Sequence, residues 1–100
     1  MDERDYAEFD FAINEDEPLF VISVVSEMVN IPVWTLRKLD DKGIVRPTRL
    51  GKKTRCYTKN QIKKLTYIYH LMEHKGVNIK GIQVIMEMSF EKEKEDDRHL

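Results

Sequence analysis

The sequence predicts a mainly α-helical domain with a small β-wing, built from four helices and a two-stranded wing. Apolar residues recur at three- and four-residue spacing in four separate stretches, which is the spacing of a helix face that packs against a core. Between the second and third stretches, a short basic segment around Gly51 has the composition of a hairpin. One hundred residues suffice for one compact domain, and a single cysteine, Cys56, leaves that domain to be held by packing alone.

Two short helices are expected first, joined by a tight turn. Ser23 is expected to cap a helix that ends at Asn30, a residue that tolerates the left-handed conformation. Pro32 suits the first turn of a second helix, and Gly43 ends it. The second helix presents apolar residues at three-residue spacing, namely Val33, Leu36 and Leu39.

A basic two-stranded wing is expected next. Pro47 forbids further helix, and residues 48–50 and 55–57 are expected to form two short strands. They flank a basic tip at 51–54, where Gly51 supplies the permissive turn position.

Two longer helices complete the domain. Thr58 and Gln61 have the spacing of a capping box, which predicts the start of a long helix that ends at Gly76. Asn78 is expected to cap a last helix that runs up to Phe90.

Charge divides the chain into three parts. Residues 1–17 form an acidic arm of net charge −7, residues 18–90 form the folded domain at +8, and residues 91–100 form a charged tail at −2. Eleven Lys or Arg residues lie from Arg37 to Lys64, against two acids. Such a local excess is the usual footprint of phosphate-backbone binding. One hypothesis is that the arm folds over the basic wing and competes with DNA; the alternatives are a solubilising tail or a helix packed on a partner.

The order of helix, tight turn, helix and basic ribbon is that of a winged helix-turn-helix. In such a domain the second helix enters the major groove of double-stranded DNA, while the ribbon reaches flanking phosphates. The candidate contacts are the cations of the second helix and of the wing: Arg37, Lys38, Arg49, Lys52, Lys53 and Arg55. The sequence therefore predicts a domain that holds a duplex at two points.

Several motifs resemble the DNA-binding domain of the MerR family of transcriptional regulators. In chain order they are Phe20-Val21-Ile22-Ser23, Thr35-Leu36-Arg37, Asp40-x-x-Gly43-Ile44-Val45-x-Pro47 and Arg55-x-Tyr57-Thr58. A further stretch, Gly76-Val77-Asn78-Ile79-Lys80-Gly81-Ile82, resembles the HspR-like heat-shock repressor branch of that family. The resemblance covers about residues 19–88 and implies a sequence-specific repressor of stress or chaperone genes.

The resemblance also implies roles for single residues. It implies that Arg37, Arg55 and Tyr57 contact the DNA backbone. It also implies that Val33 and Trp34 face base edges. Where family members have a tyrosine after the Thr-Leu-Arg motif, this chain has Lys38, which is expected to take over a backbone contact. Trp34 is expected either to pack on a thymine methyl group or to fill a gap in the core, so the operator sequence does not transfer.

The partners stay open at this point. Family dimers use a long C-terminal coiled coil, and residues 91–100 show no heptad seam. A homodimer would use the last helix or the arm, where Tyr6, Phe9 and Ile13 share one helical face. Two alternatives to the repressor remain: an excisionase-like or architectural DNA-binding protein, and an interaction module that docks on RNA polymerase or a chaperone.

Other classes are not supported by the sequence. No nucleophile with a base, phosphate-cradling loop or paired carboxylates can be assembled in the folded part, so we expect no enzyme and no cofactor. His70 and His74 lie one helical turn apart but lack a third ligand, so we expect no metal site. Without an apolar run long enough for a membrane span or a signal peptide, the chain is expected in the bacterial cytoplasm, associated with the nucleoid.

Overall fold

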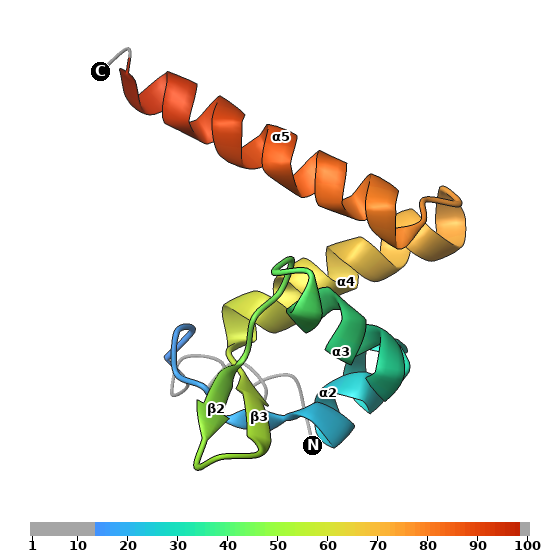
Figure 1. Cartoon of the computed structure of the whole chain (residues 1–100), viewed down its shortest axis with the longest axis vertical. Helices are drawn as coiled ribbons and strands as arrows, with labels where there is room; N and C mark the ends of the chain where they lie inside the picture. Colours follow the sequence, from blue (N-terminus) through green and yellow to red (C-terminus); the bar gives the residue numbers. More distant parts are fainter. Residues whose placement is uncertain (1–13, 99–100) are drawn as a thin grey trace, which may run out of the picture.

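The computed structural model describes residues 14–98, with side chains through residue 88. The elements are, in order, β1 (Phe20–Val21), α2 (Ile22–Val29), α3 (Val33–Asp41), β2 (Thr48–Leu50), β3 (Thr54–Tyr57), α4 (Lys59–His74) and α5 (Ile79–Arg98). Figure 1 shows the sheet, α2, α3 and α4 gathered in one body, with α5 crossing the end of α4 and extending away from it. Within the described residues, the predicted mainly helical fold with four helices is confirmed.

The sheet has one strand more than the sequence predicts. β3 lies between β1 and β2, and both pairings are antiparallel. In β1, Phe20 pairs with Tyr57 and Val21 pairs with Cys56. A strand of two residues is too short to show the alternation by which strands are detected in a sequence. This short pairing attaches the wing to the start of α2.

Side chains from α2, α3, β3, α4 and α5 form one buried cluster. Its members are Val25, Val29, Ile31, Leu36, Leu39, Ile44, Val45, Tyr57, Leu65, Ile68, Leu71 and Ile82. Burying one such aliphatic side chain stabilises the fold by about 1.5 to 3 kcal/mol relative to leaving it exposed. Because α3 contributes Leu36 and Leu39 to this cluster, its position in the domain is fixed and its opposite face is left to solvent.

The turn between α2 and α3 follows the predicted pattern, but the start of α2 does not. Asn30 ends α2 in the left-handed conformation, with φ of 57°. The Ser26 hydroxyl donates a 2.6 Å hydrogen bond to the carbonyl oxygen of Ile31, which closes the turn. The predicted cap at Ser23 is wrong: the N-cap is Val21, two residues earlier, and α2 begins at Ile22 because extended Val21 of β1 leads directly into the helix.

A capping box starts α4, as predicted. The Thr58 N–H donates to Gln61 Oε1 over 2.9 Å, and the Gln61 N–H donates to Thr58 Oγ1 over 3.0 Å. The same Gln61 side chain donates through Nε2 to the carbonyl oxygen of Arg46 over 2.6 Å. One residue therefore both caps α4 and holds the segment that leads into the wing.

The last helix is longer than predicted. Asn78 caps it, since its Oδ1 accepts a 2.8 Å hydrogen bond from the Gly81 N–H. The backbone then stays helical to Arg98, although the sequence predicts an end at Phe90 followed by a charged tail. The residues after Gly81 include no glycine or proline, and Glu, Lys and Arg are good helix formers. The sequence prediction ended this helix too early because it took the highly charged residues after Phe90 for a tail.

Candidate nucleic-acid interface

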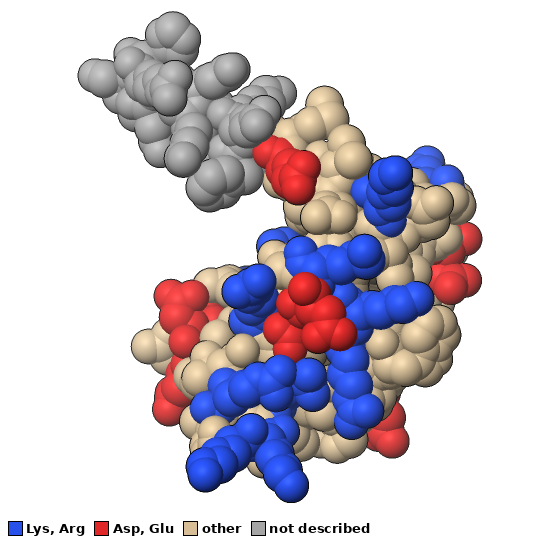
Figure 2. Space-filling view, in the orientation of Figure 1, with Lys and Arg blue, Asp and Glu red and all other residues tan. Residues whose placement is uncertain are grey.

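Basic side chains gather over α3 and the wing on one face of the domain (Figure 2). We define the basic face by the Lys and Arg residues of α3, β2, β3 and the turn between these strands. Its members are Arg37, Lys38, Arg49, Lys52, Lys53 and Arg55. All of them are exposed except Arg55, which is partly buried. These residues are the cations that the sequence singles out, and the fold brings them to two neighbouring structures.

The helix α3 divides cleanly into a buried and an exposed face. Thr35, Leu36 and Leu39 are buried, and they hold the helix against the core. Trp34, Arg37 and Lys38 are exposed and recur at the three- and four-residue spacing of one helical surface. On the exposed surface of α3, an aromatic ring is therefore followed, one turn later, by two cations of the basic face.

Trp34 does not fill a gap in the core. It is 64% exposed, the largest exposed fraction among the exposed large apolar side chains of residues 14–88. The Nζ atom of Lys38 lies 5.6 Å from the centre of the indole ring, in the geometry of a cation–π contact. Val33, the other residue expected to face base edges, is partly buried. Trp34 is thus the more accessible of the two.

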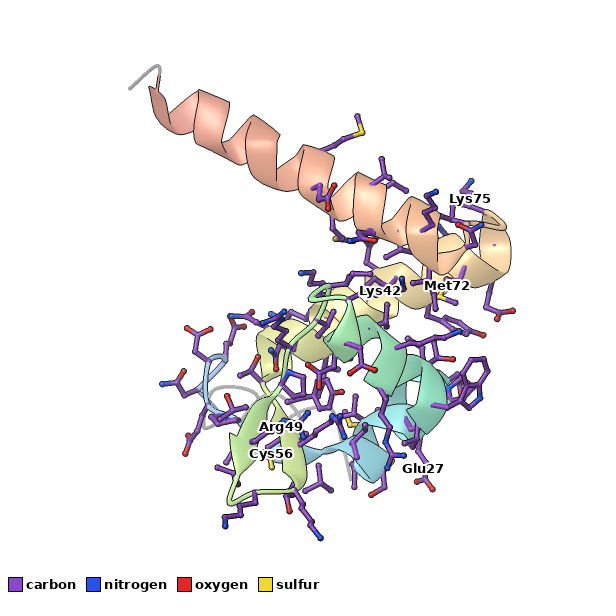
Figure 3. The ribbon with its side chains drawn as sticks, in the orientation of Figure 1. Glu27, Lys42, Arg49, Cys56, Met72 and Lys75 are labelled. Carbon is purple, nitrogen blue, oxygen red and sulfur yellow. The ribbon has the colours of Figure 1, made fainter. Side chains whose placement is uncertain are left out.

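The wing carries its cations at its tip and along its edge. Gly51 adopts φ of 67°, which turns the chain between β2 and β3. Lys52 and Lys53 follow it and are exposed. Arg49, labelled on the wing in Figure 3, keeps 46% of its side chain exposed. The wing can therefore present positive charge to a polyanion that lies beside it.

Asp40, in the last turn of α3, holds the two wing arginines. Its Oδ2 atom accepts a 2.9 Å hydrogen bond from Arg55 Nε and a 3.3 Å hydrogen bond from Arg49 Nη2. Arg49 and Arg55 are direct partners across β2 and β3, so their like charges would repel without a carboxylate between them. This contact was missed from the sequence, where the only signal was an acid in a strongly basic stretch.

Tyr57, the other expected backbone contact on β3, differs from the exposed cations of the basic face. Its side chain is fully buried, so in this conformation the hydroxyl does not reach a phosphate. That hydroxyl has no hydrogen-bond partner among the described residues. Burial, and secondarily the nearby Asp40 carboxylate, raises the pKa of Tyr57 to about 12. Tyr57 is instead part of the buried core cluster, at the end of β3 where the last two residues are both buried.

The described end of the acidic arm lies on α4. Glu15 and Lys63 form a 2.7 Å ion pair, and Asp16 Oδ1 accepts a 2.8 Å hydrogen bond from Asn60 Nδ2. The Asn60 N–H donates to the Glu15 carbonyl oxygen over 3.1 Å. The rest of the arm, including Tyr6, Phe9 and Ile13, lies outside the described residues. The part that is described therefore pairs with the start of α4.

Residues 14–88 contain no arrangement that suggests a metal site. No group of three or more His, Cys, Asp or Glu side chains among them could hold an ion. The ring centres of His70 and His74 lie 5.2 Å apart on the surface of α4, with the ring planes tilted by 37°. Cys56 is buried in the sheet.

Comparison with known proteins identifies relatives that span most of this domain. The chain is 33% identical over 78 residues to the heat shock protein HspR of Streptomyces coelicolor, which covers 78% of the chain and 52% of that protein. It is 30% identical over 71 residues to the HTH-type transcriptional regulator GlnR of Bacillus anthracis and of Bacillus cereus. Each GlnR match covers 71% of the chain and 54% of the relative. The chain therefore spans about half the length of these relatives.

The described helices are not of a kind that crosses a membrane. A sequence model of the MerR HTH family of regulatory proteins matches residues 20–89, which run from β1 into α5. The match includes the helix-turn-helix, the wing and α4, and so covers the whole of the basic face. The chain belongs to the MerR HTH family of regulatory proteins.

Proposed function

We propose that the chain is a transcriptional regulator that binds double-stranded DNA, with α3 in the major groove and the wing on flanking phosphates. The observation that carries the proposal is the exposed face of α3, where Trp34, Arg37 and Lys38 project from a helix anchored on its other side. An α-helix fits the major groove, and its exposed side chains are the ones that meet base edges and phosphates there.

The wing supports a second point of contact. Arg49, Lys52 and Lys53 are exposed on a hairpin that Gln61 and Asp40 tie to the neighbouring helices. Cations on a fixed hairpin set the register of a duplex without reading its sequence. Arg55 is engaged with Asp40 and acts within this proposal mainly by holding the wing against α3.

Salt-dependent binding tests this function directly. The full chain is titrated into a labelled duplex pool at several salt concentrations, and binding is followed by fluorescence anisotropy. If about five phosphates are contacted, log affinity falls against log salt with a slope of about −4 to −5. A flat response at measurable affinity would contradict the proposal and favour a protein-interaction module.

We further propose that the regulated genes are stress or chaperone genes and that the chain represses them. The support is the likeness to a protein named as the heat shock protein HspR, which extends over 78% of the chain. Genome-wide occupancy before and after a heat shock tests this claim. Occupancy of a few promoters, with release on induction, is expected; occupancy of recombination ends would instead indicate an excisionase-like factor.

We also propose that two copies bind together through α5. This helix exposes Val84 and Met88, and its ribbon extends beyond the body of the domain (Figure 1). Apolar side chains on an extended helix suit a partner helix. Sedimentation of the full chain and of a Val84→Lys, Met88→Lys variant tests the claim, since the variant is expected to be monomeric. A wild-type chain that sediments as a monomer would contradict it.

A further inference from the structure

The exposed indole of Trp34 needs an explanation that the fold does not provide. Trp is a large apolar side chain, and 64% of Trp34 lies in water. The neighbouring residues Thr35, Leu36 and Leu39 complete the packing of α3 without it. Exposed aromatic rings of this size are characteristic of surfaces that bind a partner.

The surroundings of the ring limit what that partner can be. Lys38 lies over the ring at 5.6 Å, and Arg37 is exposed on the same helical surface. A ligand that covers the indole therefore presents an apolar group close to negative charge. In duplex DNA this combination occurs in the major groove, where the C5-methyl group of thymine lies between two lines of phosphates.

The hydrogen-bonding capacity of indole distinguishes among the four bases. Its Nε1–H is a donor, and the ring has no acceptor. In the major groove, cytosine presents only an amino donor, and adenine presents an amino donor beside its N7 acceptor, so with either base an N–H group would face the ring without a partner. Guanine presents acceptors but no apolar group. Thymine presents both an acceptor, O4, and a methyl group. It is the base edge that matches a tryptophan best.

From this chemistry we infer that Trp34 is a specificity-determining residue that reads a thymine by packing on its C5-methyl group. The inference rests on the proposed function, because it requires α3 in the major groove. Lys38 is a positioning residue within this inference. Its ammonium group lies over one face of the ring and holds the indole against α3, which leaves the remaining surface of the ring for the base. Arg37 and Lys38 then lie near phosphates on either side of the contact.

Replacing thymine by deoxyuridine tests the inference, since it removes the methyl group and nothing else. Duplexes that the full chain retains are first selected from a random pool, and each thymine is then replaced singly. At one or two positions, the replacement is expected to weaken binding about fourfold, the effect of exposing one buried methyl group. For Trp34→Ala, the thymine and deoxyuridine duplexes are expected to bind equally at those positions.

The outcomes separate this inference from the proposed function. If the pool yields no retained duplex, the proposed function fails and takes the inference with it. If duplexes are retained with steep salt dependence but no deoxyuridine replacement matters, only the inference is overturned. The inference alone is also overturned if Trp34→Ala binds the thymine duplex more tightly than the deoxyuridine duplex by the same factor as wild type. It is overturned as well if the full chain prefers single-stranded DNA and Trp34→Ala removes that preference. Because Trp34 is exposed, Trp34→Ala is expected to fold, and its unfolding midpoint in urea checks this.

Discussion

The Nε atom of Arg55 lies 2.9 Å from Oδ2 of Asp40, and both side chains are largely covered, with 16% and 13% exposed. Asp40 lies in the last turn of the helix proposed to enter the groove, and Arg55 lies in the central strand of the wing sheet. Their contact therefore couples the two parts that must meet a duplex at once. A carboxylate in a basic face also costs some attraction for phosphates, so its main contribution is to geometry.

Asp40→Asn should destabilise the fold by about 1 to 3 kcal/mol, since it weakens hydrogen bonds from two charged groups in a partly buried setting. Urea unfolding measures the change. Asp41→Asn is the matched control, because it removes the same charge from the next residue, which is exposed. That control is expected to stay within about 0.5 kcal/mol of wild type. Equal effects of the two changes would show that charge, and not the contact, matters.

Tyr57→Phe should leave DNA binding unchanged and keep or slightly raise stability. The hydroxyl is buried without a partner among the described residues, so its removal relieves an unsatisfied polar group. Anisotropy titrations and urea unfolding measure the two effects. A large loss of affinity at unchanged stability would restore Tyr57 as a DNA contact.

The same tyrosine should make the fold sensitive to alkaline pH. Its pKa is raised to about 12, whereas an unfolded tyrosine titrates near pH 10, so the folded chain holds the proton more tightly. The contribution of the protonated Tyr57 to the free energy of unfolding is therefore complete below about pH 10. It is lost as pH rises toward about 12, which lowers stability by roughly 2 to 3 kcal/mol. The free energy of unfolding, measured in urea across this pH range, is expected to fall more steeply for wild type than for Tyr57→Phe. Tyr67→Phe, a change at an exposed tyrosine, is the control and is expected to behave as wild type.

Thr58→Ala should cost about 1 kcal/mol, because it removes the side-chain oxygen that caps α4. Thermal unfolding measures the loss. Thr66→Ala, an exposed change within the same helix, is expected to be neutral or slightly stabilising, since alanine is the better helix former. Equal losses for both would contradict a specific role for the capping box.

Local signals predicted most of this fold, because each depends on residues close in the chain. The left-handed Asn30, the Thr58 and Gln61 box and the Asn78 cap all lie where the sequence placed them. The two-residue strand β1 was missed because its identity comes from a distant partner strand. The length of α5 was missed because the highly charged residues after Phe90 were taken for a tail outside the helix.

The candidate site was predicted in composition but not in its internal contacts. Exposed Arg37, Lys38, Arg49, Lys52 and Lys53 lie on α3 and the wing, as expected, and their role in binding stays a prediction. The pairing of Asp40 with Arg55 joins residues 15 apart, and periodicity carries no information on such contacts. The motif suggested Tyr57 as a backbone contact, whereas the fold buries its side chain in the core.

The most direct test compares the salt dependence of DNA binding in Arg37→Ala and Lys75→Ala. Both variants remove one exposed positive charge, but Arg37 lies on α3 and Lys75 lies at the far end of α4, well away from the wing in Figure 3. If α3 meets the DNA backbone, Arg37→Ala should reduce the magnitude of the slope of log affinity against log salt by about one. Lys75→Ala should leave the slope unchanged. Equal slopes for the two variants would contradict the proposed interface.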